Sequence, residues 1–168
     1  MGRPLHRLAL LGLCLLLGAC GFHLRGQVSL PPVMARTAIV GLDPFNPLAR
    51  EMERALRGSG VEVVEDEAAA TAVLRVTRAD APRRLLSVQA SGKAQEIELL
   101  QFLHFRLEDP SGKILLPEQQ LEQRRDYYFD PKDPLGTTGQ EPAIRRDMRR
   151  DIVQLMMLRL QAAPGRQE

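Results

Sequence analysis

The stretch Ala94–Phe129, AQEIELLQFLHFRLEDPSGKILLPEQQLEQRRDYYF, decides the fold of this chain. From Ile97 onward, apolar side chains fall on every second position with one interruption, and this period of two predicts a half-buried strand over 94–107. Asp109–Gly112 has the composition of a hairpin turn, and 113–129 returns as a long second strand. The later part of the returning strand is polar, which is typical of an edge strand or of a strand with one solvated face.

The region before this hairpin predicts a β-α-β unit followed by two more strands. The apolar run 37–42 predicts a first strand, and Asn46-Pro47 is a typical helix start because asparagine caps a helix and proline fits its first position. Apolar residues at helical spacing continue this helix to two glycines, after which 61–65 predicts a second strand. The strand-like runs 72–77 and 83–91 follow without a helix between them.

The last predicted element is a helix near the C-terminus. Thr138 and Glu141 have the spacing of a capping box, and Pro142 marks an alternative start one turn later. The apolar face of this helix consists of Ile144, Met148, Ile152, Leu155, Met156 and Leu160. The predicted order is therefore β-α-β-β-β-β-α, and each helix has one apolar stripe to bury. We expect an α+β fold, a two-layer sandwich with two helices packed on one mostly antiparallel, mixed sheet of about four to six strands.

The N-terminus has the three parts of a secretory signal, and the signal ends at a cysteine. Basic residues precede the apolar run 8–17, which rises only about 15 Å as a helix and cannot span a bilayer core of about 30 Å. The sequence Leu17-Gly18-Ala19-Cys20 is similar to the lipobox at which bacterial lipoproteins are cleaved. We predict cleavage before Cys20 and attachment of lipid to Cys20. The alternative is a plain secreted protein with a chance cysteine at this position.

These features predict the domain organisation. We expect a removed signal peptide over 1–19, a lipidated tether over 20–35, a single α/β sandwich domain over 36–163 and a disordered tail over 164–168. Processing also discards Cys14, so the mature chain has no disulfide. The formal charge of +2 is 23 basic minus 21 acidic residues, and it becomes zero when two signal arginines leave. A neutral chain lacks the basic excess of a nucleic-acid binder, and no nucleic acid partner is expected.

The sequence lacks the motifs of catalysis and cofactor binding. It has no Gly-x-Ser-x-Gly elbow, no thiol free to act as a nucleophile and no glycine-rich phosphate loop. The mature chain keeps only His23 and His104, and neither has a partner at metal-ligand spacing. We therefore expect no enzyme, no cofactor and no metal. The alternative, a lipid-anchored hydrolase, requires a nucleophile and a base that the fold brings together.

A basic cluster on the last predicted helix is the candidate binding site. Two adjacent i, i+4 ridges predict a positive patch beside the apolar stripe, and such a patch fits phosphate groups of lipid head groups or an acidic partner. Lys93, at a predicted hairpin tip, is a second candidate cation. A solvated helix face with snorkelling arginines, and a solvated lysine, are the alternatives. The residues of the two ridges are Arg145 with Arg149 and Arg146 with Arg150.

Short motifs along the mature chain resemble one known family, the LPS-assembly lipoproteins of the LptE family. The similarity rests on the order and spacing of several motifs and covers nearly the whole mature chain. The motifs are CGFHLRG at 20–26, Pro31-Pro32, Pro47-Leu48, GVEV at 60–63, Ser87-Val88 ahead of Gly92, and RDYYFD at 125–130.

The resemblance implies a structural role at the outer membrane. Family members are anchored in its inner leaflet by acyl chains including palmitate, and their domain faces the periplasm and a barrel lumen. They plug a large β-barrel, the LPS-assembly protein LptD, one to one, help it assemble and contact lipopolysaccharide. Gly21 is consistent with the outer membrane, because an aspartate after the lipidated cysteine typically retains lipoproteins in the inner membrane. An accessory lipoprotein of another envelope machine, such as a secretin pilot or a lipid-transport auxiliary, is the alternative.

The resemblance also implies basic contacts with lipopolysaccharide at two places. They are the tip of the hairpin before the long strand and the loop before the last helix. In this chain those places hold Ala90-Ser91 and Thr138. The nearby cations that we expect to take the place of the missing ones are Lys93 and Arg145 or Arg146.

Overall fold

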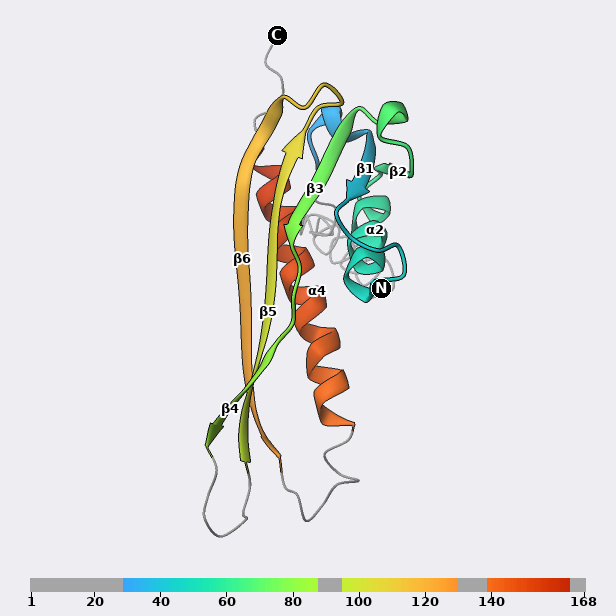
Figure 1. The fold of residues 1–168 in the computed structure, drawn as a ribbon. Helices are drawn as coiled ribbons and strands as arrows, with labels where there is room; N and C mark the ends of the chain where they lie inside the picture. Colours follow the sequence, from blue (N-terminus) through green and yellow to red (C-terminus); the bar gives the residue numbers. More distant parts are fainter. Residues whose placement is uncertain (1–28, 88–94, 130–138, 164–168) are drawn as a thin grey trace, which may run out of the picture.

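The computed structural model describes residues 29–87, 95–129 and 139–163. Two α-helices lie on one face of a mixed sheet of six strands (Figure 1), which confirms the predicted α+β sandwich. All six strand-like runs of the sequence are strands, so the observed order, β-α-β-β-β-β-β-α, has one more strand than the predicted order. In chain order the elements, with η for a 3-10 helix, are η1 (Pro32–Met34), β1 (Arg36–Val40), α2 (Pro47–Gly58), β2 (Glu62–Val64), η2 (Glu67–Ala69), β3 (Ala72–Arg78), β4 (Arg83–Ser87), β5 (Gln95–Glu108), β6 (Ile114–Phe129) and α4 (Gln140–Gln161).

The β5–β6 hairpin forms the long axis of the molecule. β5 pairs with β6 along its whole length, and its 14 residues extend over about 45 Å. On the other side of β5, β4 pairs near the start of the strand and β3 pairs near its end, so that β3 and β4 follow one another along the same edge (Figure 1). β1 lies parallel to β3 and to β2. The described part of β6 pairs only with β5 and is an edge strand, which is one of the two alternatives that its polar sequence left open.

The core lies between the sheet and the two helices. The alternation predicted for the central strand is confirmed, since Leu99, Leu103, Phe105 and Leu107 of β5 are fully buried. The stripe of α4 differs from the predicted one at Leu155, which is 37% exposed, because α4 also packs against α2 and turns Val153 and Met157 inward. The helical residues of the main core are Leu48, Met52 and Leu56 of α2 and Ile152, Val153, Met156, Met157 and Leu160 of α4.

The two helices begin differently. The Asn46 side chain accepts a hydrogen bond from the backbone N–H of Leu48 at 2.8 Å, as predicted for a helix cap. α4 begins at Gln140 after Gly139, and the predicted start one turn later is not observed. Thr138, the other candidate for a cap, lies outside the described residues.

Packing begins before the predicted domain boundary at residue 36. Met34 is fully buried, and the Thr71 hydroxyl donates to the carbonyl oxygens of Val33 at 2.7 Å and Arg36 at 2.9 Å. These contacts fix the N-terminal segment at the end of the sheet where β3 begins. The signal peptide, the first part of the tether, Cys20 and the C-terminal tail lie outside the described residues.

Candidate functional site

A hydrogen-bonded group joins the end of β6 to the start of α4. The Tyr127 hydroxyl donates to Oε2 of Glu141 at 2.7 Å, and Nε of Arg145 donates to Oε1 of the same carboxylate at 2.7 Å. Arg145 also donates through Nη1 to the carbonyl oxygen of Ala81 at 2.9 Å, just before β4. Three segments that are distant in the sequence are therefore held together at this end of the molecule.

In this group one carboxylate, Glu141, is paired with one guanidinium, Arg145, and with the neutral hydroxyl of Tyr127. Burial raises the pKa of Tyr127 to about 12, and its hydrogen bond to Glu141 acts in the same direction. Burial pushes the pKa of Glu141 upward, but the hydrogen bonds from Tyr127 and Arg145 outweigh it, and the pKa lies below its ordinary value. Glu141 is thus a carboxylate near neutral pH. Arg145 binds this carboxylate and the carbonyl oxygen of Ala81, and it thereby holds the start of α4 against the segment before β4. The spacing of the arginines did not indicate this role.

The remaining arginines of the predicted patch point in two directions. Arg146 and Arg150 are exposed, and Nη1 of Arg150 lies 3.7 Å from Oδ1 of Asp147. Arg149 is half-buried, and this burial lowers the pKa of its guanidinium against the attraction of Glu51. The ridge of Arg145 and Arg149 therefore turns toward the protein, while the ridge of Arg146 and Arg150 faces solvent. Lys93 lies outside the described residues.

The face of the sheet opposite the helices contains a buried carboxylate. The side chain of Glu98 on β5 is 5% exposed and lies between Arg84 of β4 and Arg124 of β6, at 3.3 and 3.2 Å. Its Oε2 atom has no hydrogen bond in the described structure, so its contact with Arg84 is one of charge alone. The alternation of side chains along β5 puts Glu98 on the face opposite the core, but only the register of β4 and β6 brings the two arginines over it.

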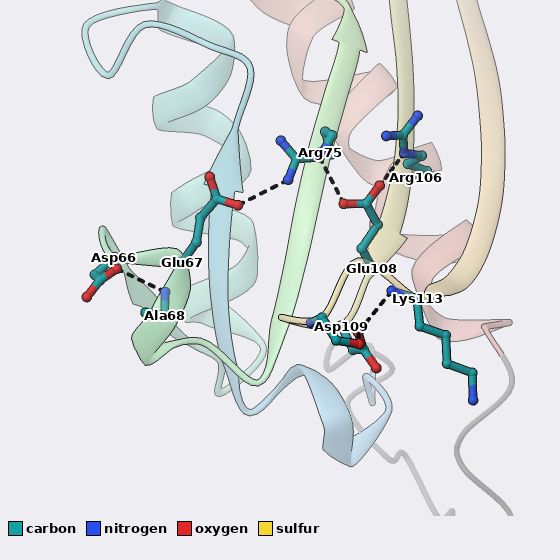
Figure 2. Close-up of polar contacts among 9 residues, drawn as sticks. Asp66, Glu67, Ala68, Arg75, Arg106, Glu108, Asp109 and Lys113 are labelled. Carbon is teal, nitrogen blue, oxygen red and sulfur yellow. Dashed lines mark hydrogen bonds and ion pairs between the residues drawn. The ribbon is translucent and has the colours of Figure 1, made fainter.

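A second buried carboxylate lies at the opposite end of β5 (Figure 2). Glu108 accepts a hydrogen bond from Nε of Arg75 at 2.9 Å and another from Nε of Arg106. Arg75 also donates through Nη2 to Glu67 at 3.0 Å. The hydrogen bond from Arg75, followed by that from Arg106, lowers the pKa of Glu108 although burial opposes the change. This network ties β3, β5 and η2 together.

The adjacent turn between β5 and β6 is closed by Asp109. Its Oδ1 accepts hydrogen bonds from the backbone N–H groups of Ser111 at 2.9 Å and Lys113 at 3.0 Å, the latter drawn in Figure 2. The Ser111 hydroxyl also donates to this carboxylate and is the main reason that its pKa is lowered. This geometry confirms the hairpin turn that the sequence predicted here.

We predict that Glu108→Gln lowers the free energy of unfolding by about 1–3 kcal/mol at pH 7, because Arg75 and Arg106 lose their charged partner. Since the folded pKa of Glu108 is lowered, its stabilisation is complete above the unfolded pKa of about 4.3 and is lost as pH falls through the folded value. The free energies of unfolding of the unchanged chain and of Glu108→Gln, measured in urea, should therefore differ less below about pH 4 than at pH 7.

The matched control is Glu53→Gln on α2, whose partner Arg57 is well exposed. It should change the free energy of unfolding by less than about 0.5 kcal/mol, both at pH 7 and below about pH 4. A difference for Glu108→Gln that stays constant on acidification would contradict the assignment.

Within the described residues, no cluster of three or more histidine, cysteine, aspartate or glutamate side chains is arranged to hold a metal ion. No helix in the same ranges is long and apolar enough to cross a membrane.

Comparison with known proteins identifies the family. A family model described as LptE, lipopolysaccharide-assembly, matches residues 28–160, which is most of the chain. The chain belongs to the LptE family. The LPS-assembly lipoprotein LptE of Photorhabdus laumondii is 30% identical over 158 residues, which cover 92% of this chain and 86% of that protein. The LptE protein of Pectobacterium atrosepticum is 30% identical over 167 residues, 97% of this chain and 90% of that protein.

Two solved structures of lipoproteins share this fold. Lipoprotein B from Nitrosomonas europaea superimposes with a TM-score of 0.66 at 29% identity and covers 82% of this chain and 88% of its own. The rare lipoprotein B from Shewanella oneidensis gives a TM-score of 0.61 at 27% identity over 76% of this chain and 93% of its own. The LptE family is a family of lipoproteins without enzymatic activity, which confirms the predicted family and the prediction that the chain is not an enzyme.

Proposed function

We propose that this LptE-family chain is an outer-membrane lipoprotein that plugs a large β-barrel, an LptD-like translocon for lipopolysaccharide. It would form a one-to-one complex, help the barrel assemble and contact lipopolysaccharide in transit. The observation that carries the proposal is the family match over 28–160, which covers all six strands of the sheet, α2 and all but the last residue of α4. Relatives that match over most of their length are named LPS-assembly lipoproteins.

The shape and surface of the domain support a plug. The β5–β6 hairpin extends over about 45 Å, which exceeds the bilayer core of about 30 Å that a barrel crosses. The interior of such barrels is polar. The sheet face opposite the helices suits those surroundings, because its buried carboxylates Glu98 and Glu108 are covered by paired arginines.

The proposed anchor is lipid on Cys20 in the inner leaflet of the outer membrane. Gly21 after the cysteine favours this membrane over the inner one. The segment from Cys20 to Ser29, where the described structure begins, reaches at most about 30 Å when extended. The domain would therefore stay close to the membrane surface on its periplasmic side, within reach of a barrel lumen.

The proposed contact with lipopolysaccharide involves the outward-facing arginines. Arg146 and Arg150 present their guanidinium groups to solvent, and such groups bind phosphates by charge-assisted hydrogen bonds. Arg149 and Lys93 are further candidates. Arg145 is bound to Glu141 and would act by holding the chain in place.

We predict that the double change Arg146→Glu and Arg150→Glu weakens binding of purified lipopolysaccharide about tenfold, because two cations become anions. Binding is measured by crosslinking in detergent. The matched control reverses Arg54 and Arg57 on α2, which are equally exposed, and should leave binding unchanged. Equal losses in both double variants would mean that only net charge matters, and the arginine ridge would then have no special role.

The function itself is tested by mild detergent extraction of membranes and affinity purification of the full lipidated chain. The expected result is a stable one-to-one complex with a very large outer-membrane barrel. Recovery of a free, monodisperse lipoprotein would overturn the proposal. Recovery with a secretin or with another lipid-transport machine would assign the chain to the alternative class of accessory lipoproteins.

A further inference from the structure

The outer edge of β6 is a long, regular strand edge. Among the described strands β6 pairs only with β5, and the register runs without a shift from Gln95↔Phe129 to Phe105↔Gln119. The register shifts, and Pro117, lie beyond this stretch toward the start of the strand. An unpaired strand edge presents backbone N–H and C=O groups with which a further strand can pair.

We propose that this edge pairs with a second copy of the chain, with the two β6 strands antiparallel about Gln123. In this register Glu122 lies directly opposite Arg124 of the other copy, and the same pair forms twice. Moving the centre to residue 122 or 124 would instead set two glutamates or two arginines against each other. Opposite charges across a pair of strands are stabilising and like charges are destabilising, so the charges favour Gln123 over both neighbouring centres. Arg124 already pairs with Glu122 and Glu98 of its own chain, and the pairs between the two copies would add to this network.

The surface of α4 beside this edge supports the same centre independently. Leu155 and Leu158 are 37% and 55% exposed, and helical spacing puts them on the same side of α4 as Asp151. Asp151 pairs with Arg125 of β6 at 2.8 Å, so this side of α4 lies along the strand. Leu155 is one turn, about 6 Å, beyond Asp151, and because α4 runs back along β6 this brings it level with Gln123.

Pairing about a two-fold axis at Gln123 therefore has two structural consequences. It joins the two sheets into one continuous sheet, and it brings the exposed leucines of the two α4 helices toward each other. Burial of such apolar side chains favours association. The pairing goes beyond the proposed function and does not rest on it, since it concerns the chain before it enters a one-to-one complex with a different partner.

The test uses the full lipidated chain in its own membranes with Gln123→Cys. Because Cys14 leaves with the signal and Cys20 is expected to be lipidated, residue 123 would hold the lone free thiol. Oxidation or a short thiol-specific crosslinker should give a dimer of this chain. The matched control is Gln120→Cys on the same strand. In the proposed register its two thiols are about 20 Å apart, too far for a disulfide, and no dimer should form.

Charge reversal then tests the register. Glu122→Arg in the Gln123→Cys chain sets arginines opposite each other and should reduce the dimer at least about fivefold. Leu155→Glu should reduce it as well, while Glu65→Arg, at an exposed position after β2, should not. Unchanged unfolding midpoints would show that the variants fold.

Three results would overturn the proposal. They are crosslinking at residue 120 as strong as at 123, a dimer insensitive to Glu122→Arg, and crosslinking of residue 123 to a different protein alone. The last result would assign the edge to another partner. Co-purification of a barrel is scored separately in the same strains, so failure of self-pairing and failure of the proposed function remain distinguishable.

Discussion

Replacing Cys20 by serine is expected to release the protein from membranes. The hydroxyl of serine cannot take the place of the thiol that receives the lipid, and the described residues contain no helix that could hold the chain in a bilayer. Each buried CH₂ group contributes roughly 0.8 kcal/mol, so losing several acyl chains removes far more binding energy than any single contact in the domain. The measurement is membrane fractionation together with incorporation of labelled palmitate.

The chain offers a matched control in Cys14→Ser. This cysteine lies within the apolar part of the signal peptide, and its replacement should change neither the fractionation nor the labelling. Palmitate on the Cys20→Ser chain, or a loss of label in Cys14→Ser as well, would show that Cys20 is not the lipidated residue. Loss of the anchor need not unfold the domain, because the described core begins at Met34.

The parts of the fold that sequence predicts well are those set by local periodicity. The alternation after Ile97 predicted β5 because one face of this strand is buried from end to end. The start of α2 was predicted because Asn46 and Pro47 satisfy the helix terminus through neighbouring residues alone. Each of these features depends on contacts within a few positions of the chain.

The order of the strands depends on pairing over long distances and could not be predicted. β3 and β4 lie on the same side of β5, and the link between them stays bound to it: Leu100 donates its N–H to the carbonyl of Pro82 at 3.0 Å, and Phe102 to that of Asp80 at 2.8 Å. Nothing in the local pattern indicates that two strand-like runs share one edge. The same register decides that Glu98 is covered by arginines.

The candidate site shows the same limit. Helical spacing correctly grouped the four arginines of α4 into two ridges, but it could not tell which ridge faces the protein. That depends on Glu141 and on the carbonyl of Ala81, which lies 64 positions before Arg145 in the sequence. An ion pair at i, i+4 between Glu141 and Arg145 was visible in the sequence, and it was the available signal that Arg145 differs from Arg146.

Gly41 is the position where a single methyl group is expected to have the largest effect on stability. Its φ of +91° lies in the left-handed region, and a Cβ atom would come within 2.1 Å of the carbonyl oxygen of Val76 on β3. Gly41→Ala should therefore lower the free energy of unfolding by about 3 kcal/mol or more, a large part of the roughly 5–15 kcal/mol that is typical of a domain.

Gly60→Ala separates the two causes of this loss. Gly60 has a similar φ of +84°, but no atom lies within 4 Å of the place that its added methyl group would take. Gly60→Ala should lower the free energy of unfolding only by the cost of placing an alanine in the left-handed region, about 1–2 kcal/mol. Urea unfolding of both variants gives the difference, which measures the clash of Gly41 with β3. Equal losses would show that β1 and β3 move apart at little cost, and the tight approach of Gly41 to Val76 would then not be what requires glycine there.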